Sequence, residues 1–221
     1  MSVTLGVSVE SGRADRVSTE VLVAPFFGSD RPLRGPAAQA DWRLCGWLSD
    51  ELRAGRTQGR LGEAALLLSG GRLRARWLLA LGLGPRPSFG ARALRDATRE
   101  GTLRLVGLRV ASAVFALPPE LVCGLAAPRA AEAWLQGTLE ALERRPGALR
   151  LRLLVEPGEA GRVRSALVEA ASRHPGPVVV RWLAASPSRP AGERAGADHA
   201  GSPEGLPAQN ATRHPDPPSL P

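Results

Sequence analysis

The sequence predicts an α/β fold in which helices cover both faces of a mixed β-sheet. Strand-like and helix-like apolar patterns alternate along most of the 221-residue chain, and this alternation is typical of a sheet with helices on its faces. Two strand-like segments, 64–68 and 77–81, are joined by a short turn at Gly70-Gly71. Parallel neighbours need a longer crossover connection, so we expect this pair to be antiparallel and the sheet to be mixed. The prediction is therefore a three-layer α/β domain.

Seven segments carry strand patterns. The first, 3–9, alternates apolar and polar residues as a half-buried strand does. The second, 21–27, is a short apolar run rich in branched and aromatic side chains, which favour strands. The complete set of expected strands is 3–9, 21–27, 64–68, 77–81, 113–117, 149–155 and 178–183.

Four segments have helical periodicity. Residues 38–54 repeat apolar side chains at helical spacing, and Gly55 is expected to end this helix. Ser88 is expected to cap a second helix, and Pro128 suits the first turn of a third. A short fourth helix is expected around 163–170. The shared face of the first helix contains Asp41, Leu44, Cys45, Trp47, Leu48 and Leu52.

The last part of the chain, 186–221, differs in kind from the rest. It holds eight prolines and almost no large apolar side chains. Such a segment buries too little surface to offset the entropy lost on ordering. We predict a folded domain at 1–185 and a disordered, proline-rich tail at 186–221.

Composition and charge narrow the class of protein. The net charge is +8, and all 29 basic residues are Arg. Arg, Ala, Gly and Pro share GC-rich codons, so the charge is read as a compositional bias rather than as the mark of a nucleic-acid partner. Residues 1–16 lack the pattern of a signal peptide, and the longest apolar run is far shorter than the ~18 residues of a membrane span. We expect a cytoplasmic protein with no membrane association, whose two cysteines are buried and inert.

Several stretches resemble the N-terminal domain of leucyl aminopeptidases. The segments Arg31-Pro32-Leu33-Arg34-Gly35 and Asp41-Trp42-Arg43-Leu44-Cys45-Gly46 are similar to the loop and helix after that domain's second strand. Leu61-Gly62-Glu63, followed by an apolar strand and by the segment 77–84, is similar to the family's strand pair, which ends in Gly-Leu-Gly. The resemblance covers residues 3–145 well and 149–185 by pattern. It implies a macro-domain-like, three-layer fold with a mixed sheet.

The resemblance stops short of the family's catalytic half. That half carries a two-metal site built from Lys, several Asp and a Glu, including an Asn-Thr-Asp-Ala-Glu-Gly-Arg stretch. This chain has no Lys, and its seven Asp residues are scattered, whereas two metal ions need clustered carboxylates. We therefore expect a non-catalytic chain without metal or cofactor, so a true peptidase is the least expected function.

A small ligand is expected, if anywhere, where strands end, because α/β folds bind ligands at the carboxyl ends of their strands. By resemblance to macro domains, ADP-ribose would be held there. The candidate cleft residues are Phe26, Phe27, Gly28, Asp30, Gly82 and Gly84.

Other residues argue against a nucleotide at this cleft. Macro domains have an Asn-rich strand end and a Gly-rich second loop, but this chain has Pro25-Phe26-Phe27 and Leu117-Pro118-Pro119 at these places. Pro85 and Pro87 also remove N–H groups that a phosphate-binding turn needs. We expect the two phenylalanines to be core or loop anchors and Gly82-Leu83-Gly84 to form a tight turn.

Arginine clusters form a second candidate surface. Alternation along strands would place Arg72, Arg74 and Arg76 on one face, and likewise Arg150 and Arg152. Such sets could contact phosphate backbones, and some aminopeptidases of this family bind DNA. The chain has no Tyr and no interleaving of basic and aromatic residues, so a solvated surface is favoured.

Three functions stay open. The first is a non-catalytic assembly or protein-interaction module, because the resemblance implies a domain that contributes to an oligomer; it would form a homo-oligomer or pair with a separately encoded aminopeptidase catalytic chain. The second is a nucleotide or ADP-ribose binder at the strand-end cleft. The third is an arginine-mediated DNA binder. We favour the first.

Overall fold

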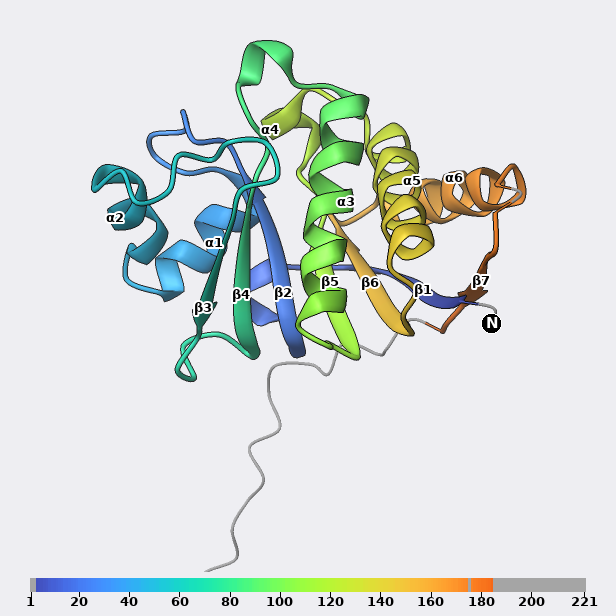
Figure 1. Ribbon diagram of the computed structural model, residues 1–221. Helices are drawn as coiled ribbons and strands as arrows, with labels where there is room; N and C mark the ends of the chain where they lie inside the picture. The colour runs from blue at the N-terminus through green and yellow to red at the C-terminus, as the bar shows by residue number, and fades with distance from the viewer. Residues whose placement is uncertain (1–2, 175, 185–221) are drawn as a thin grey trace, which may run out of the picture. The chain divides into compact units, whose positions relative to one another are not determined.

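A computed structural model describes residues 3–174 and 176–184 of the chain. Its centre is a seven-stranded sheet in the order β3-β4-β2-β5-β6-β1-β7 (Figure 1). All neighbouring strands are parallel except β3, which is antiparallel to β4. The mixed sheet expected from the sequence is thus confirmed. The strands are β1 (Val3–Ser11), β2 (Thr19–Phe26), β3 (Ala64–Leu68), β4 (Ala75–Gly82), β5 (Ser112–Ala116), β6 (Leu149–Val155) and β7 (Val178–Trp182).

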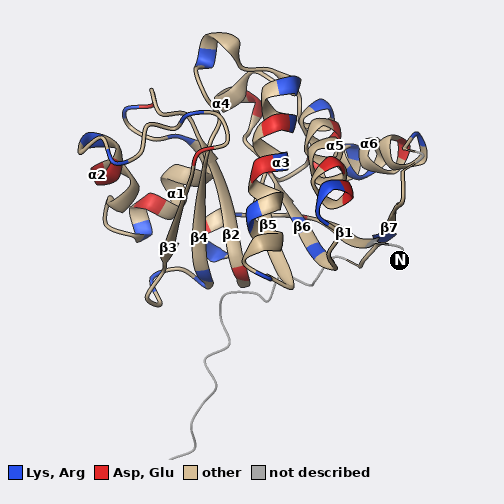
Figure 2. Ribbon diagram, in the orientation of Figure 1, with Lys and Arg blue, Asp and Glu red and all other residues tan. Residues whose placement is uncertain are grey.

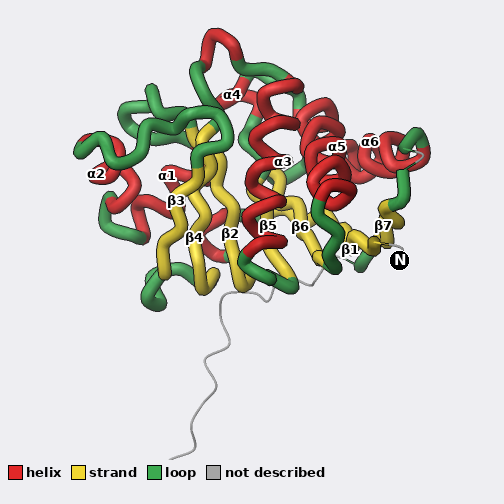
Figure 3. Tube along the Cα trace, in the orientation of Figure 1, coloured by secondary structure: helices red, strands yellow, loops and turns green. Residues whose placement is uncertain are grey.

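Helices cover both faces of the sheet, which gives three layers. Figures 1 and 3 show α3, α5 and α6 on one face and α1 and α2 on the other. A single helical turn, α4, follows β5. The helices are α1 (Gly35–Arg43), α2 (Trp47–Arg53), α3 (Ala91–Gly107), α4 (Glu120–Cys123), α5 (Ala127–Arg144) and α6 (Ala160–Ser172), with 3-10 turns at Ala14–Arg16 and Arg86–Ser88. No described helix is both long enough and apolar enough to cross a membrane.

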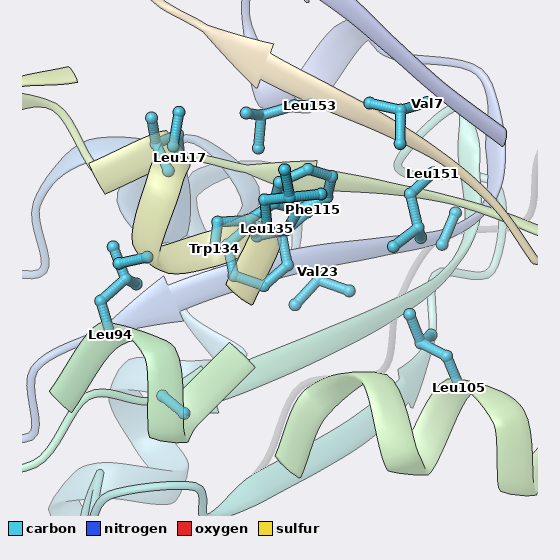
Figure 4. Close-up of a cluster of buried hydrophobic side chains, with 14 of the residues drawn as sticks. Val7, Val23, Leu94, Leu105, Phe115, Leu117, Trp134, Leu135, Leu151 and Leu153 are labelled. Atoms are coloured by element: carbon cyan, nitrogen blue, oxygen red, sulfur yellow. The ribbon is translucent and has the colours of Figure 1, made fainter. Parts of the chain in front are cut away.

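The larger core lies between the sheet and α3, α5 and α6. Trp134 of α5 is fully buried and its ring centroid lies 6.2 Å from that of Phe115 on β5 (Figure 4). The helices α3 and α5 cross so closely that a Cβ at Gly137 would lie 2.2 Å from the Arg95 carbonyl oxygen. A glycine at this crossing is therefore required by the packing of the two helices.

The smaller core lies under α1 and α2 and explains why the strands differ in sequence. It takes side chains from β2, β4 and β5, with Ala65 and Leu67 of β3 packed against it. Among the residues whose burial is described, it reaches only Leu154 of β6 and includes none from β1 or β7. Strands β2 and β4 are therefore covered on both faces and have continuous apolar sequences. Strands β1 and β6 alternate apolar and polar residues because the α1 face of the sheet presents polar side chains in this half.

The first predicted helix is wrong in one respect. The segment 38–54 forms two helices rather than one. The first helix ends near Leu44 because Cys45 (φ 56°) and Gly46 (φ 83°) both adopt the left-handed conformation. Asp41 lies near the end of α1, and its carboxylate accepts hydrogen bonds from the Leu48 N–H at 2.7 Å and the Ser49 hydroxyl at 2.6 Å. The acid thus caps the start of α2 rather than extending a single helix.

Two other expectations at this level differ from the structure. Ser88 does not cap α3: its hydroxyl bonds to the Pro85 carbonyl in a 3-10 turn, and the cap position of α3 is Gly90. The turn α4 has no counterpart among the expected helices. The predicted tail, 186–221, lies outside the described residues, and the boundary at residue 185 stays a prediction.

Candidate functional site

The structure brings the predicted cleft residues together at the carboxyl ends of β2 and β4. Phe26 and Gly82 are register partners on these two parallel strands. The Leu83 N–H donates to the Phe26 carbonyl at 2.9 Å, which fixes the two chain ends side by side. Phe26 and Phe27 are buried, so their expected role as anchors is confirmed.

A loop of the chain, 57–62, crosses these strand ends. The Gly62 N–H donates to the Gly82 carbonyl, and the Gly84 N–H donates to the Gly59 carbonyl, both at 2.9 Å. Gly84 has φ +77°, a conformation that favours glycine. The segment after β4 is therefore an irregular stretch paired to β2 and to the loop, and the chain turns only at Arg86–Ser88, so the expected tight turn at Gly82-Leu83-Gly84 is not seen.

Two of the candidate glycines are required by this crossing loop. A Cβ at Gly28 would lie 1.7 Å from the Gln58 carbonyl oxygen, and a Cβ at Gly82 would lie 2.2 Å from the Arg60 carbonyl oxygen. Neither distance is compatible with a side chain. The backbone of the loop therefore packs directly against Gly28 and Gly82, at the strand ends where a ligand would otherwise lie.

An ion pair fills the space next to this loop. Arg86 binds Asp30 through two hydrogen bonds of 2.8 and 2.9 Å, and its third donor bonds to the Val122 carbonyl at 2.6 Å. Only 6% of Asp30 is exposed. Arg86 thus ties together the loop after β2, the turn after β4 and the turn α4. Hydrogen bonding to Asp30 raises the pKa of Arg86 above its usual value, so the guanidinium stays charged.

Aromatic rings complete this plug, which we define as Asp30, Arg86, Phe27 and Phe89. The Arg86 guanidinium carbon lies 4.3 Å from the Phe27 ring centroid, a cation–π distance. The Phe27 and Phe89 rings meet edge to face with centroids 4.9 Å apart. Both charged groups of the plug are paired within the protein: Asp30 is almost fully buried and Arg86 uses three of its five N–H donors on Asp30 and Val122. This pairing disfavours their use in holding a phosphate or a reacting group.

A small cavity lies at the carboxyl ends of β1, β5 and β6, and no residue of the plug lines it. Its volume is about 150 Å³, whereas small-molecule sites usually measure roughly 300–1,000 Å³. Its lining includes Gly12, Pro36, Gln39, Leu117 and Val155. A cavity of this size accommodates a few water molecules rather than a nucleotide.

Glu63 holds the crossing loop in place. Its carboxylate accepts the Thr57 hydroxyl at 2.9 Å and the Arg60 N–H at 2.9 Å, together with the Gln58 N–H at 3.2 Å. Burial by itself raises the pKa of Glu63, but the hydrogen bonds outweigh it and hold the pKa below its ordinary value.

The lowered pKa of Glu63 gives a pH-dependent contribution to stability. A depressed folded-state pKa contributes above the unfolded value of about 4.3, and the contribution is lost as pH falls through the lower folded value. We expect Glu63→Gln to cost about 1–2 kcal/mol of unfolding free energy at pH 7 and much less at pH 3. Urea unfolding at the two pH values measures this, with the exposed Glu169→Gln as control. Equal behaviour of the two variants would contradict the role of Glu63.

The described part of the chain offers no group of side chains arranged to bind a metal ion. Among residues 3–174 and 176–184, no three His, Cys, Asp or Glu side chains lie close enough together to hold a metal ion. Cys123 is half-buried, and burial raises the pKa of its thiol, which keeps it protonated and unreactive. Cys45 is exposed, so the expectation that both cysteines are buried is wrong for this residue, because the helix breaks there.

The predicted arginine sets occupy separate places. Arg72, Arg74 and Arg76 are exposed at the β3–β4 turn and the start of β4, and two strands separate β4 from β6, which carries Arg150 and Arg152. Arg152 pairs with Glu10 at 3.1 Å and bonds to the Ser18 carbonyl. Figure 2 shows basic residues spread over strands, helices and loops. The structure does not join the two sets into one surface.

An apolar groove at the α1–α2 break was missed by sequence reasoning. It has a volume of about 510 Å³ and is lined by Pro32, Leu33, Ala38, Trp42, Cys45 and Gly46, with Asp41 and Ser49. Trp42 is 83% exposed, which is unusual for so large an apolar side chain. We call this surface the Trp42 groove. Gly46 within an otherwise helical pattern was the one signal for it, because glycine often marks a break.

Solved structures define the class of fold. A macrodomain variant from Oceanobacillus iheyensis has a TM-score of 0.62 at 17% identity, over 76% of this chain and 94% of the other. The macro domain of ganglioside induced differentiation associated protein 2 has a TM-score of 0.59 at 18% identity, over 74% and 83%. A Trypanosoma brucei macrodomain in complex with ADP has 0.59 at 18%, over 73% and 68%. The protein therefore has a macrodomain-like fold.

A match to a family model identifies the family to which the chain belongs. Residues 23–144 match the model of the cytosol aminopeptidase family, N-terminal domain. This match spans more than half of the chain, so the protein belongs to that family through its N-terminal domain. A comparison with curated proteins found no match.

Proposed function

We propose that the protein is a non-catalytic assembly module of aminopeptidase systems. It would associate in the cytoplasm with a second copy of itself or with a separately encoded aminopeptidase catalytic chain. The family match covers only the N-terminal domain of the cytosol aminopeptidase family, and the catalytic residues of that family are not among the residues matched. The plug and the crossing loop leave little room for a substrate at the strand ends.

The Trp42 groove is the observation that carries this proposal. Tryptophan is enriched among the residues that dominate binding energy at protein interfaces, and exposed apolar patches mark such interfaces. The groove combines an exposed indole with the apolar side chains of Pro32, Leu33 and Ala38. Asp41 and Ser49 also line the groove, but they are hydrogen-bonded to each other, so the apolar side chains and the indole would provide the contact with a partner.

Replacing Trp42 by serine tests the proposal. We expect the wild type to form a discrete oligomer, or a complex with a co-expressed aminopeptidase catalytic chain, and Trp42→Ser to weaken either at least about tenfold. Light scattering over a concentration series measures self-association, and co-purification measures the complex. Leu121→Ser is the matched control, because Leu121 is 93% exposed and lies outside the groove lining. A wild type that stays monomeric and alone, or a control that weakens association equally, would contradict the proposal.

A second candidate function is binding of an ADP-ribose-type ligand. The macrodomain-like fold favours it, and one neighbour is described in complex with ADP. The observed filling of the strand ends argues against it, because Arg86 and Asp30 already satisfy each other there. We therefore place this function second. Calorimetric titration with ADP-ribose distinguishes ligand binding from the assembly function.

A further inference from the structure

The half of the sheet outside the smaller core carries a pair of arginines around a glycine. Gly6 of β1 is the register partner of Arg150 on β6 and also of Arg181 on β7. Register partners on neighbouring parallel strands point to the same face of the sheet. Two arginine side chains therefore rise on either side of a position that has none. Arg181 was not among the residues that the sequence singled out.

Gly6, Arg150 and Arg181 line a surface cavity. A cavity of about 330 Å³ is lined by Thr4, Gly6, Ala148, Arg150, Arg181 and Leu183, among others. Gly6 makes room for its neighbours there, because a Cβ would lie 2.9 Å from Leu183 Cδ1 and 3.1 Å from Arg150 Cγ and these side chains would have to shift. The Arg150 stem thus lies against the glycine floor. The volume is at the lower end of the range of small-molecule sites.

The charges in this hollow are unbalanced. Within residues 3–174 and 176–184, no carboxylate lies within ion-pairing distance of Arg150 or Arg181. By contrast, Arg152, two residues further along β6, pairs with Glu10 at 3.1 Å. Two like charges beside a concave surface raise the local potential and favour an anion there.

We propose that Arg150 and Arg181 bind the phosphate group of a small anionic molecule over Gly6. A tetrahedral phosphate presents oxygens on several sides, so it can accept hydrogen bonds from two guanidinium groups at once. A single planar carboxylate is satisfied by one of them. The site shares no residue with the Trp42 groove, so it stands or fails independently of the assembly function.

Calorimetric titration of the full chain with sodium pyrophosphate, in a phosphate-free buffer of low ionic strength, tests the proposal. We expect saturable binding with one site per chain. Arg150→Gln and Arg181→Gln should each weaken it at least about tenfold, since each removes charge-assisted hydrogen bonds to the phosphate. Arg164→Gln, an exposed arginine on α6 with no ion pair in the described part, should leave the affinity unchanged.

A second readout does not depend on variants. Amide signals of Thr4 and Gly6 in a nitrogen–proton NMR spectrum of the wild type should shift on titration with pyrophosphate. The proposal is overturned if no saturable binding occurs, if these amides do not move, or if Arg164→Gln weakens binding as much as the other two. Equal affinity for succinate would overturn the phosphate class. Displacement of pyrophosphate by a short DNA duplex that binds more tightly through the same arginines would assign the surface to a nucleic-acid backbone instead.

Discussion

Replacing Gly28 by alanine should lower the free energy of unfolding by about 3 kcal/mol, at the upper end of typical overpacking costs. The new Cβ would meet the Gln58 carbonyl oxygen at 1.7 Å, so the loop 57–62 must move away from the strand ends. That movement also strains the hydrogen bonds that Glu63 accepts. Urea unfolding followed by circular dichroism measures the loss.

The control for this prediction is Gly161→Ala. A Cβ at Gly161 meets nothing within 4 Å, and alanine is a better helix former than glycine. This variant should be unchanged or more stable by up to about 1 kcal/mol. If Gly28→Ala were as stable as the wild type, Gly28 would not serve the close approach of the loop, and a role toward a ligand would be open again.

Replacing Arg86 by alanine is expected to cost about 2–3 kcal/mol. Removing one partner of a buried ion pair leaves the other charge unpaired, which typically costs 3–5 kcal/mol. The value is reduced here because 35% of the Arg86 side chain is exposed. The loss includes the contact with the Phe27 ring and the bond to the Val122 carbonyl.

A double-mutant cycle isolates the ion pair. Arg86→Ala and Asp30→Asn should destabilise by less in combination than the sum of their separate effects, with a coupling of at least about 1 kcal/mol. Arg53→Ala is the control, because Arg53 pairs with Asp50 on the exposed surface of α2 and such pairs contribute about 0–1 kcal/mol. Additive effects of Arg86→Ala and Asp30→Asn would show that the plug is not held by this pair.

The sheet was predictable because the apolar pattern of each strand depends on whether helices pack on one or both of its faces. The unbroken apolar run at β2 reflects apolar packing on both faces, and the alternation at β1 reflects apolar packing on one face and small or polar side chains on the other. Gly70 and Gly71 both adopt positive φ, so the turn between β3 and β4 was visible in the sequence. The break between α1 and α2 was not, because Cys45 adopts the left-handed conformation without being a residue type that favours it.

The candidate site was predictable in position but not in content. The phenylalanines and glycines at the ends of β2 and β4 could be located because strand ends gather at one edge. What fills that edge comes from distant segments: Arg86 is 56 residues away from Asp30, and Gln58 approaches Gly28 through a loop with no pattern of its own. Pairings of this kind depend on tertiary packing and leave no local signal.

Surface residues were likewise predictable one at a time, whereas the sites that they form together were not. The exposure of Arg150 followed from its alternation along β6, yet its neighbour across the sheet, Arg181, follows only from the strand order, in which β1 lies between β6 and β7. Trp42 lies outside the apolar face expected for residues 38–54, and its 83% exposure agrees with that pattern, but the pattern gave no sign of the groove beside it. Sequence periodicity therefore locates faces of elements, whereas juxtaposition of elements creates sites.

The most direct test of the account is a calorimetric titration of the wild-type protein with ADP-ribose and with ADP. The loop 57–62 crosses the ends of β2 and β4, and the plug pairs Arg86 with Asp30 beside it. We therefore expect no saturable binding up to millimolar ligand and no rise in melting temperature. Micromolar binding of either nucleotide that is lost in Asp30→Ala would contradict it and place a ligand where the protein's own side chains were assigned.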